Sequence, residues 1–152
     1  MNKEDSHYDK CLAELFTLLP KDQIDKVFRQ YMCDIDATFI GFINVYKNLS
    51  EIIPKHFTII DFGCAYNPQC FFFKDHHKYI AVDNSDLLKF KSDNCQFYYD
   101  NINSFIKEHG QEFNVKETFA ICSYVPADTK IIRETFPNVF VYYPHGSNSF
   151  KK

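Results

Sequence analysis

Glycine is scarce in this sequence, with four glycines among 152 residues, and no GxGxxG pattern is present. The absence of that pattern disfavours a nicotinamide-dependent reductase, whose loop uses such glycines to approach a pyrophosphate. Tryptophan is absent too, whereas seventeen phenylalanines and ten tyrosines are present. At a hydrophobic content of 45%, this composition predicts a single folded domain with a strongly aromatic core.

A surplus of basic residues is also missing. The chain has 17 Lys and Arg against 20 Asp and Glu, which gives a formal net charge of −3. Proteins that bind nucleic acid neutralise phosphates with a basic patch or stripe, and the sequence contains no such run. The charge therefore does not indicate a nucleic-acid partner.

Long apolar runs and paired cysteines are lacking as well. No stretch is long enough to span a bilayer, and Met1–Ser6 is too polar for a signal peptide, so we expect a cytoplasmic protein with no membrane partner. The six cysteines show no CxxC spacing and are interpreted as small buried hydrophobes in a reducing compartment. The cysteines and histidines of residues 64–77 fit no zinc-ligand spacing, and no metal site is predicted.

Residues 1–54 show helical periodicity and are predicted to form an N-terminal helical segment packed on the core. Apolar side chains recur at three- and four-residue steps as far as Leu19, and Pro20 marks a boundary. Asp22 is predicted to be the N-cap of a second helix. A third helix is predicted over Ile35–Ile53 from its broad apolar stripe.

From Phe57 onward, short apolar runs alternate with helical segments, which predicts parallel strands joined by right-handed crossovers in an α/β fold. This core is expected to occupy residues 55–145, followed by a flexible tail over residues 146–152. The predicted strands are Thr58–Phe62, Tyr79–Val82, Gln96–Tyr99, Thr118–Ser123 and Val139–Tyr143. The predicted helices are Gln69–Asp75, Asp86–Phe90, Ile102–His109 and Asp128–Thr135.

The first two predicted strands each end in an acidic residue. The first runs through Asp61 into Gly63, and the second ends at Asp83. A glycine just after a buried strand lets the backbone turn sharply beside a ligand, and an acid at the end of the next strand can accept hydrogen bonds from ribose hydroxyls. Together they predict a nucleoside-binding cleft.

This pattern resembles that of class I S-adenosylmethionine-dependent methyltransferases, over roughly Phe57–Pro144. Their first strand ends in an acid followed by a glycine-rich turn, and their second strand ends in the ribose-binding acid. The resemblance implies a Rossmann-like, methyltransferase-type three-layer sandwich, truncated here to about five parallel strands. Ala65 and Asn67 stand where the family usually has further glycines. Alanine costs little and asparagine tolerates a positive φ, so the loop is still expected to turn.

The resemblance also implies roles for particular residues. Asp61 would help to hold the methionine amino group of S-adenosylmethionine, with a capping carboxylate that organises the loop as the alternative. Gly63 and Ala65 would form the loop beside the cofactor. Asp83 would bind the ribose, unless it is an ordinary helix N-cap.

Two further positions match less closely. Asp100 and Asn101 stand where the family contacts the adenine amino group, although an Asp-Asn pair after a strand is also an ordinary turn. Ser123 and Tyr124 lie where amino-methylating members orient the acceptor, and the alternative is a strand end finished by a proline turn.

The predicted function is that of a small S-adenosylmethionine-binding protein, a methyltransferase that releases S-adenosylhomocysteine and has an unidentified methyl acceptor. The alternative is a catalytically silent methyltransferase-like module that acts through a protein partner. The substituted glycines and the missing strands of the family favour this alternative. Because no strand is predicted beyond Val139–Tyr143, that edge is expected to be open. Either the N-terminal helices or a second copy of the chain would cover it, and a homodimer through this edge is the favoured alternative.

Overall fold

The computed structural model describes residues 10, 13–31, 37–84, 89–123, 129–142 and 149–151. Residues 13–18 are helical, and the other α-helices are α2 (Lys21–Tyr31), α3 (Ala37–Ile52), α4 (Ile102–His109) and α5 (Thr129–Thr135). The strands are β1 (Thr58–Phe62), β2 (Lys78–Asp83), β3 (Cys95–Tyr99), β4 (Thr118–Ser123), β5 (Val139–Tyr142) and β6 (Ser149–Lys151). Three 3-10 helices complete the list: η1 (Pro68–Phe73), η2 (Gly110–Glu112) and η3 (Val115–Glu117).

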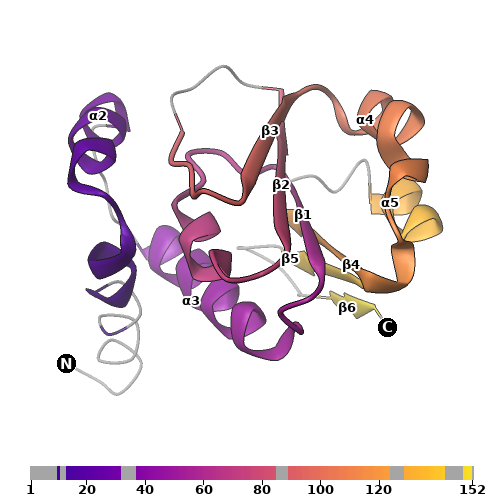
Figure 1. The fold of residues 1–152 in the computed structure, drawn as a ribbon, viewed down its shortest axis with the longest axis horizontal. Coiled ribbons are helices and arrows are strands. Elements are labelled where there is room, and N and C mark those ends of the chain that lie inside the picture. Colours follow the sequence, from indigo (N-terminus) through magenta and orange to yellow (C-terminus); the bar gives the residue numbers. More distant parts are fainter. Residues whose placement is uncertain are drawn as a thin grey trace.

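All six strands form one sheet in the order β3-β2-β1-β4-β5-β6. The pairs among β1 to β5 are parallel, and β6 runs antiparallel to β5. The order of the five parallel strands is that of a Rossmann-like sheet. The predicted fold, five parallel strands with flanking helices, is therefore confirmed (Figure 1).

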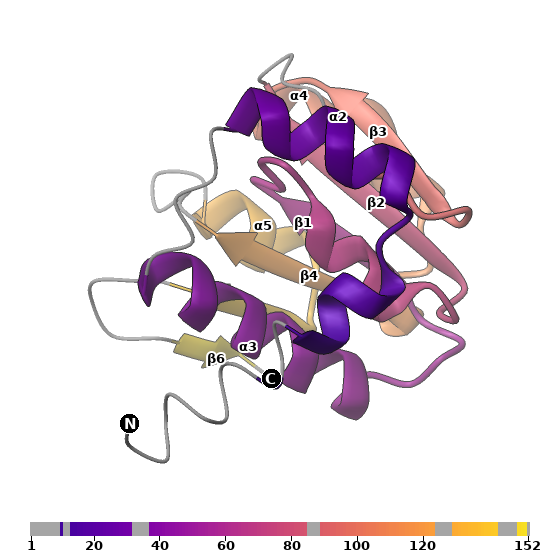
Figure 2. The same ribbon diagram turned by 90° about the vertical axis from the view of Figure 1, so that its left-hand side faces the viewer.

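β1 and its neighbours β2 and β4 are mostly apolar and buried because the centre of the sheet is covered on both faces, whereas the edge strand β3 is partly exposed. Every residue of β1 is buried. Ile59 belongs to the core on one face, with side chains from α3 and η1, while Ile60 belongs to the core on the other face, with side chains from α4 and α5. Figures 1 and 2 show the resulting three layers, with α3 on one side of the sheet and α4 and α5 on the other.

The N-terminal helices join the core on the α3 face. Leu15, Leu19 and Val27 are buried in the same cluster as the core residues of α3. The side chain of Gln23 in α2 donates to the Lys91 carbonyl oxygen over 3.1 Å and accepts from the Lys91 N–H over 2.8 Å. The predicted helices are thus present, but α2 begins one residue before Asp22, which lies in the first helical turn and is not the N-cap.

The expectation of an open fifth strand was wrong. β6 pairs with β5 in the register Val139↔Lys151, Phe140↔Phe150 and Val141↔Ser149, so part of the predicted flexible tail is a strand. Backbone N–H and C=O groups at a strand edge need partners, and a polar extended segment supplies them as well as an apolar one does. The β5 edge therefore has a partner within the chain, and a homodimer through this edge stays a prediction.

Two other expectations are revised or fall outside the described residues. The predicted helix over Gln69–Asp75 is the 3-10 helix η1. Most of the predicted helix Asp86–Phe90 lies outside the described part of the chain, and its last two residues are not helical. None of the described helices combines the length and apolar character needed to cross a membrane.

Candidate functional site

The carboxyl ends of β1, β2 and β3 meet at one edge of the sheet. β2 and β3 follow on one side of β1, whereas β4 and β5 lie on its other side, so the strand order changes direction at β1. In open α/β sheets ligands bind at this point, outside the carboxyl ends of the strands. The loop that leaves β1 is therefore the first place to look for a binding site.

This loop turns through three residues with positive φ. Gly63, Ala65 and Asn67 have φ angles of 86°, 50° and 67°. The Gly63 N–H donates to the Val82 carbonyl oxygen over 2.8 Å, which ties the start of the loop to β2. The prediction that Ala65 and Asn67 still allow the turn is confirmed, because both adopt the left-handed conformation without being glycine.

Asp83 connects this loop to the end of β2. Its Oδ2 accepts a hydrogen bond of 2.9 Å from the Ala65 N–H. Its carbonyl oxygen accepts a hydrogen bond of 3.2 Å from the Asp100 N–H, which joins the ends of β2 and β3. The structure thus brings Gly63, Ala65, Asp83 and Asp100 together at one edge of the sheet, as the sequence predicts.

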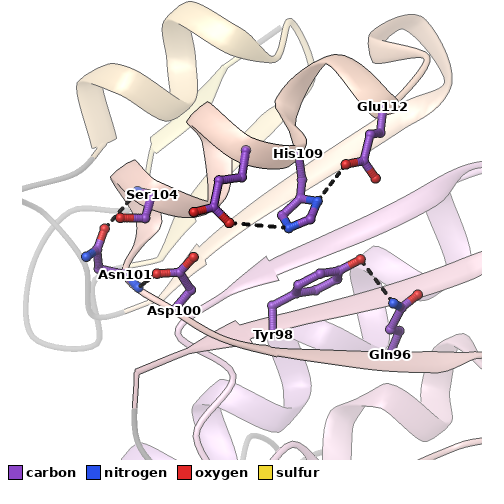
Figure 3. A network of polar contacts seen from close by, with 8 residues as sticks. Gln96, Tyr98, Asp100, Asn101, Ser104, His109 and Glu112 are labelled. Carbon is purple, nitrogen blue, oxygen red and sulfur yellow. Dashed lines mark hydrogen bonds and ion pairs between the residues drawn. The ribbon is translucent and has the colours of Figure 1, made fainter.

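Asp100 and Asn101 form the turn between β3 and α4. The Asn101 N–H donates to Asp100 Oδ1 over 2.8 Å, and Asn101 Oδ1 accepts from the Ser104 N–H over 2.8 Å (Figure 3). Asn101 is therefore the N-cap of α4. These are the contacts expected of an ordinary turn, and a role in binding adenine stays a prediction.

Asp61 lies in a different environment from Asp83. Its side chain is fully buried and accepts hydrogen bonds from the Tyr46 hydroxyl (2.6 Å), the Tyr79 hydroxyl (2.5 Å) and the Gln69 amide (2.9 Å). Burial raises the pKa of Asp61 from 3.8 to about 6, and the three donors oppose that rise. The carboxylate lies inside the fold, as in the predicted alternative of a carboxylate that organises the loop.

Sequence reasoning missed Tyr46, Gln69 and Tyr79. Tyr46 and Tyr79 lie within apolar stretches, where an aromatic residue is expected to pack. Gln69 is a single polar residue that stands shortly before a run of phenylalanines. They are 15, 8 and 18 residues from Asp61 along the chain. No local pattern links residues at these separations.

The remaining predicted residues are at the end of β4. Ser123 is the last residue of this strand, which pairs with β1 on the side away from β2. Tyr124 lies outside the described residues. The predicted acceptor role of this pair is not tested by the geometry.

Asn67 offers a test of the loop conformation. Its side chain is fully buried, and its amide donates to the Phe90 carbonyl oxygen (3.1 Å) and to Cys95 Sγ (3.4 Å). We expect both Asn67→Gly and Asn67→Ala to lower the free energy of unfolding. Alanine should cost about 1 kcal/mol more, because a left-handed backbone is disfavoured for residues with a Cβ. Urea denaturation of the two variants measures the free energy that each loses. Equal losses would contradict the role assigned to the positive φ of residue 67.

No protein-family model and no curated protein matches the sequence. Among solved structures, a candidate methyltransferase from Streptococcus mutans in complex with SAH is similar to this chain, with 21% sequence identity and a TM-score of 0.46. The match covers 72% of this chain and 75% of that one. Because a likeness at this level carries no functional argument, the function proposed below is argued from the chain's own residues alone.

Proposed function

We propose that the chain binds S-adenosylmethionine at the loop after β1, with S-adenosylhomocysteine as the product complex of a methyl transfer. The observation that carries this proposal is the 2.9 Å hydrogen bond from the Ala65 N–H to Asp83 Oδ2. It joins the turn after β1 to the acid that ends β2, at the edge of a Rossmann-like sheet where nucleoside ligands bind.

The residues at this edge suit the parts of such a ligand. The Gly63 and Ala65 backbone, held in a tight turn, would lie beside the methionine portion. Asp83 would accept hydrogen bonds from the ribose hydroxyls, and Asp100 with Asn101 would lie near the adenine amino group. Each of these assignments follows from the position of the residue at the end of β1, β2 or β3.

The chemistry requires little from the protein beyond placement. The sulfonium of S-adenosylmethionine supplies an activated methyl group. Alignment with the acceptor then provides most of the rate enhancement through proximity and orientation. Ser123 at the end of β4, with Tyr124 after it, would orient the acceptor, and no dedicated base is needed.

A second candidate function is a silent methyltransferase-like module that binds a partner protein. One observation favours it. Both carboxylates of the predicted cofactor site already have partners within the chain, because Asp61 accepts from three side chains and Asp83 from the Ala65 N–H. In this case the loop would be a structural turn with no ligand.

A melting experiment separates the two functions. S-adenosylhomocysteine at about 100 times its Kd should stabilise the folded state by about 2.7 kcal/mol, because it binds only that state. For a chain of this size the expected rise in Tm is several degrees, at roughly 2–4 °C per kcal/mol. Methionine at the same concentration serves as the control. An unchanged Tm at saturating S-adenosylhomocysteine would favour the silent module.

A further inference from the structure

We infer that Asp61, together with Tyr46, Tyr79 and Gln69, is a buried positioning network that holds the loop after β1 and ties it to α3. Under the proposed function, on which this part rests, Asp61 would set the affinity for the S-adenosyl ligand without touching it. The Asp61 carboxylate is fully buried, and all three side chains around it donate to its oxygens.

Gln69 links the carboxylate to the loop backbone. Its amide nitrogen donates to Asp61 Oδ2 over 2.9 Å and to the Cys64 carbonyl oxygen over 3.0 Å. The same carbonyl oxygen accepts from the Asn67 N–H over 3.0 Å. The Gln69 side chain therefore connects Asp61 to the carbonyl oxygen that closes the turn containing Ala65. If Gln69 moved, the left-handed turn would lose one of its anchors.

Tyr46 links the carboxylate to the N-terminal helices. It lies in α3, is fully buried, and donates to Asp61 Oδ1 over 2.6 Å. Its ring packs edge-on against Phe73 at the end of η1, with ring centroids 6.4 Å apart. Tyr79 in β2 donates to the second carboxylate oxygen. A displacement of α3 would therefore reach the Cys64 carbonyl of the loop through three consecutive hydrogen bonds, from Tyr46 to Asp61, from Asp61 to Gln69 and from Gln69 to Cys64.

Burying the Asp61 carboxylate costs free energy, which a side chain that only filled space would not cost. A carboxylate that is fully removed from water is unfavourable unless donors compensate it, and the donors found here are neutral. The titratable groups that act on the pKa of Asp61 are Tyr46 of α3 and Tyr79 and Asp83 of β2. Together with burial, Asp61 in turn acts to raise the pKa values of three nearby thiols, those of Cys64 in the loop, Cys95 in β3 and Cys122 in β4. No cationic side chain is among these described groups.

The test compares Tyr46→Phe with Tyr98→Phe. Both variants remove one hydroxyl, but that of Tyr98 lies on the opposite face of the sheet, where it accepts from Gln96 over 3.0 Å. In Tyr46→Phe we expect faster hydrogen exchange at the amides of residues 63–67 and of Gln69. We also expect about three- to tenfold weaker binding of S-adenosylhomocysteine, which corresponds to a fraction of one charge-assisted hydrogen bond. Tyr98→Phe should change neither. Gln69→Met, which removes the same link from the other end, should reproduce the effects of Tyr46→Phe.

The pH profile separates positioning from general stability. Affinity should fall as the pH drops through about 6, because a protonated Asp61 cannot accept from all three donors. Since the Tyr46 hydrogen bond lowers the pKa of Asp61, its removal should move the midpoint to higher pH. If hydrogen exchange at the same loop amides is as slow in both Tyr46→Phe and Gln69→Met as in the unmodified protein, the network does not hold the loop. If exchange is faster but the affinity for S-adenosylhomocysteine and the midpoint of its pH profile are unchanged, the network does not set the affinity for the ligand. If exchange is faster in the variants but the unmodified protein binds no S-adenosylhomocysteine, the proposed function is wrong and the network still holds the loop.

Discussion

Replacing Asp61 with asparagine is expected to remove the contribution of this carboxyl group to the pH dependence of the free energy of unfolding between about pH 4 and pH 6. The pKa of Asp61 is raised from 3.8 to about 6 in the folded state, chiefly by burial. Between these two values the folded state holds more protons than the unfolded state, so the free energy of unfolding falls as the pH rises. The total loss is about 3 kcal/mol, at 1.36 kcal/mol per pH unit over about two units.

The comparison with Asp61→Asn isolates this effect from other titrating groups. Burial lowers the pKa of His76, which acts in the opposite direction, because the unfolded state then binds the extra proton and stability rises with pH. Both proteins contain His76, so its contribution cancels in the difference. An asparagine also keeps one acceptor for the buried donors, and the tyrosine hydroxyls can accept from its amide.

Urea denaturation of both proteins across this pH range measures the difference directly. The native protein should lose stability relative to Asp61→Asn as the pH rises through about 6. Parallel curves would mean that the folded protein does not raise the pKa of Asp61. Acidification is thus expected to stabilise the native protein relative to Asp61→Asn while it weakens ligand binding, a combination that general acid unfolding does not produce.

Asp83→Ala is expected to weaken the binding of S-adenosylhomocysteine by about 1.5–3 kcal/mol, the range for hydrogen bonds to a charged group. Two contributions act together. The ribose hydroxyls would lose their acceptor, and the Ala65 N–H would lose the carboxylate that holds the loop in place. Asp83 is only partly buried at the end of β2, so folding should change little.

Asp93→Ala is a matched control for this variant. Asp93 is exposed and precedes β3, at the opposite end of the strands from the proposed cleft. Titration calorimetry should give native affinity for Asp93→Ala and a weakened one for Asp83→Ala. A well-folded Asp83→Ala with native affinity would show that the ribose does not bind at this residue.

Much of the fold could be predicted because β1, β2 and β4, at the centre of the sheet, are mostly apolar runs buried on both faces. β1 and β4 begin and end at the predicted residues, since each is an apolar run bounded by polar or turn-forming residues. α4 also has its predicted bounds, although its N-cap Asn101 was predicted only as an adenine contact or part of a turn. β6 could not be predicted in this way. Its pairing with β5 depends on backbone groups, which every residue has.

The candidate site was predicted only in part, for a related reason. The positions of Gly63, Ala65 and Asp83 follow from strand ends and their order, which the sequence indicates. The surroundings of Asp61 depend instead on Tyr46 and Tyr79, which reach it from α3 and β2. A tyrosine within an apolar stretch gives no sign of whether its hydroxyl finds a buried carboxylate. The sequence therefore located the acid but not its partners.

Titration calorimetry of the native protein with S-adenosylhomocysteine tests the central claim most directly. The proposed site predicts a saturable heat with one ligand bound per chain, at the loop joined to Asp83 by the Ala65 N–H. The absence of any heat at ligand concentrations well above those of the protein would contradict the claim and leave the loop as a structural turn.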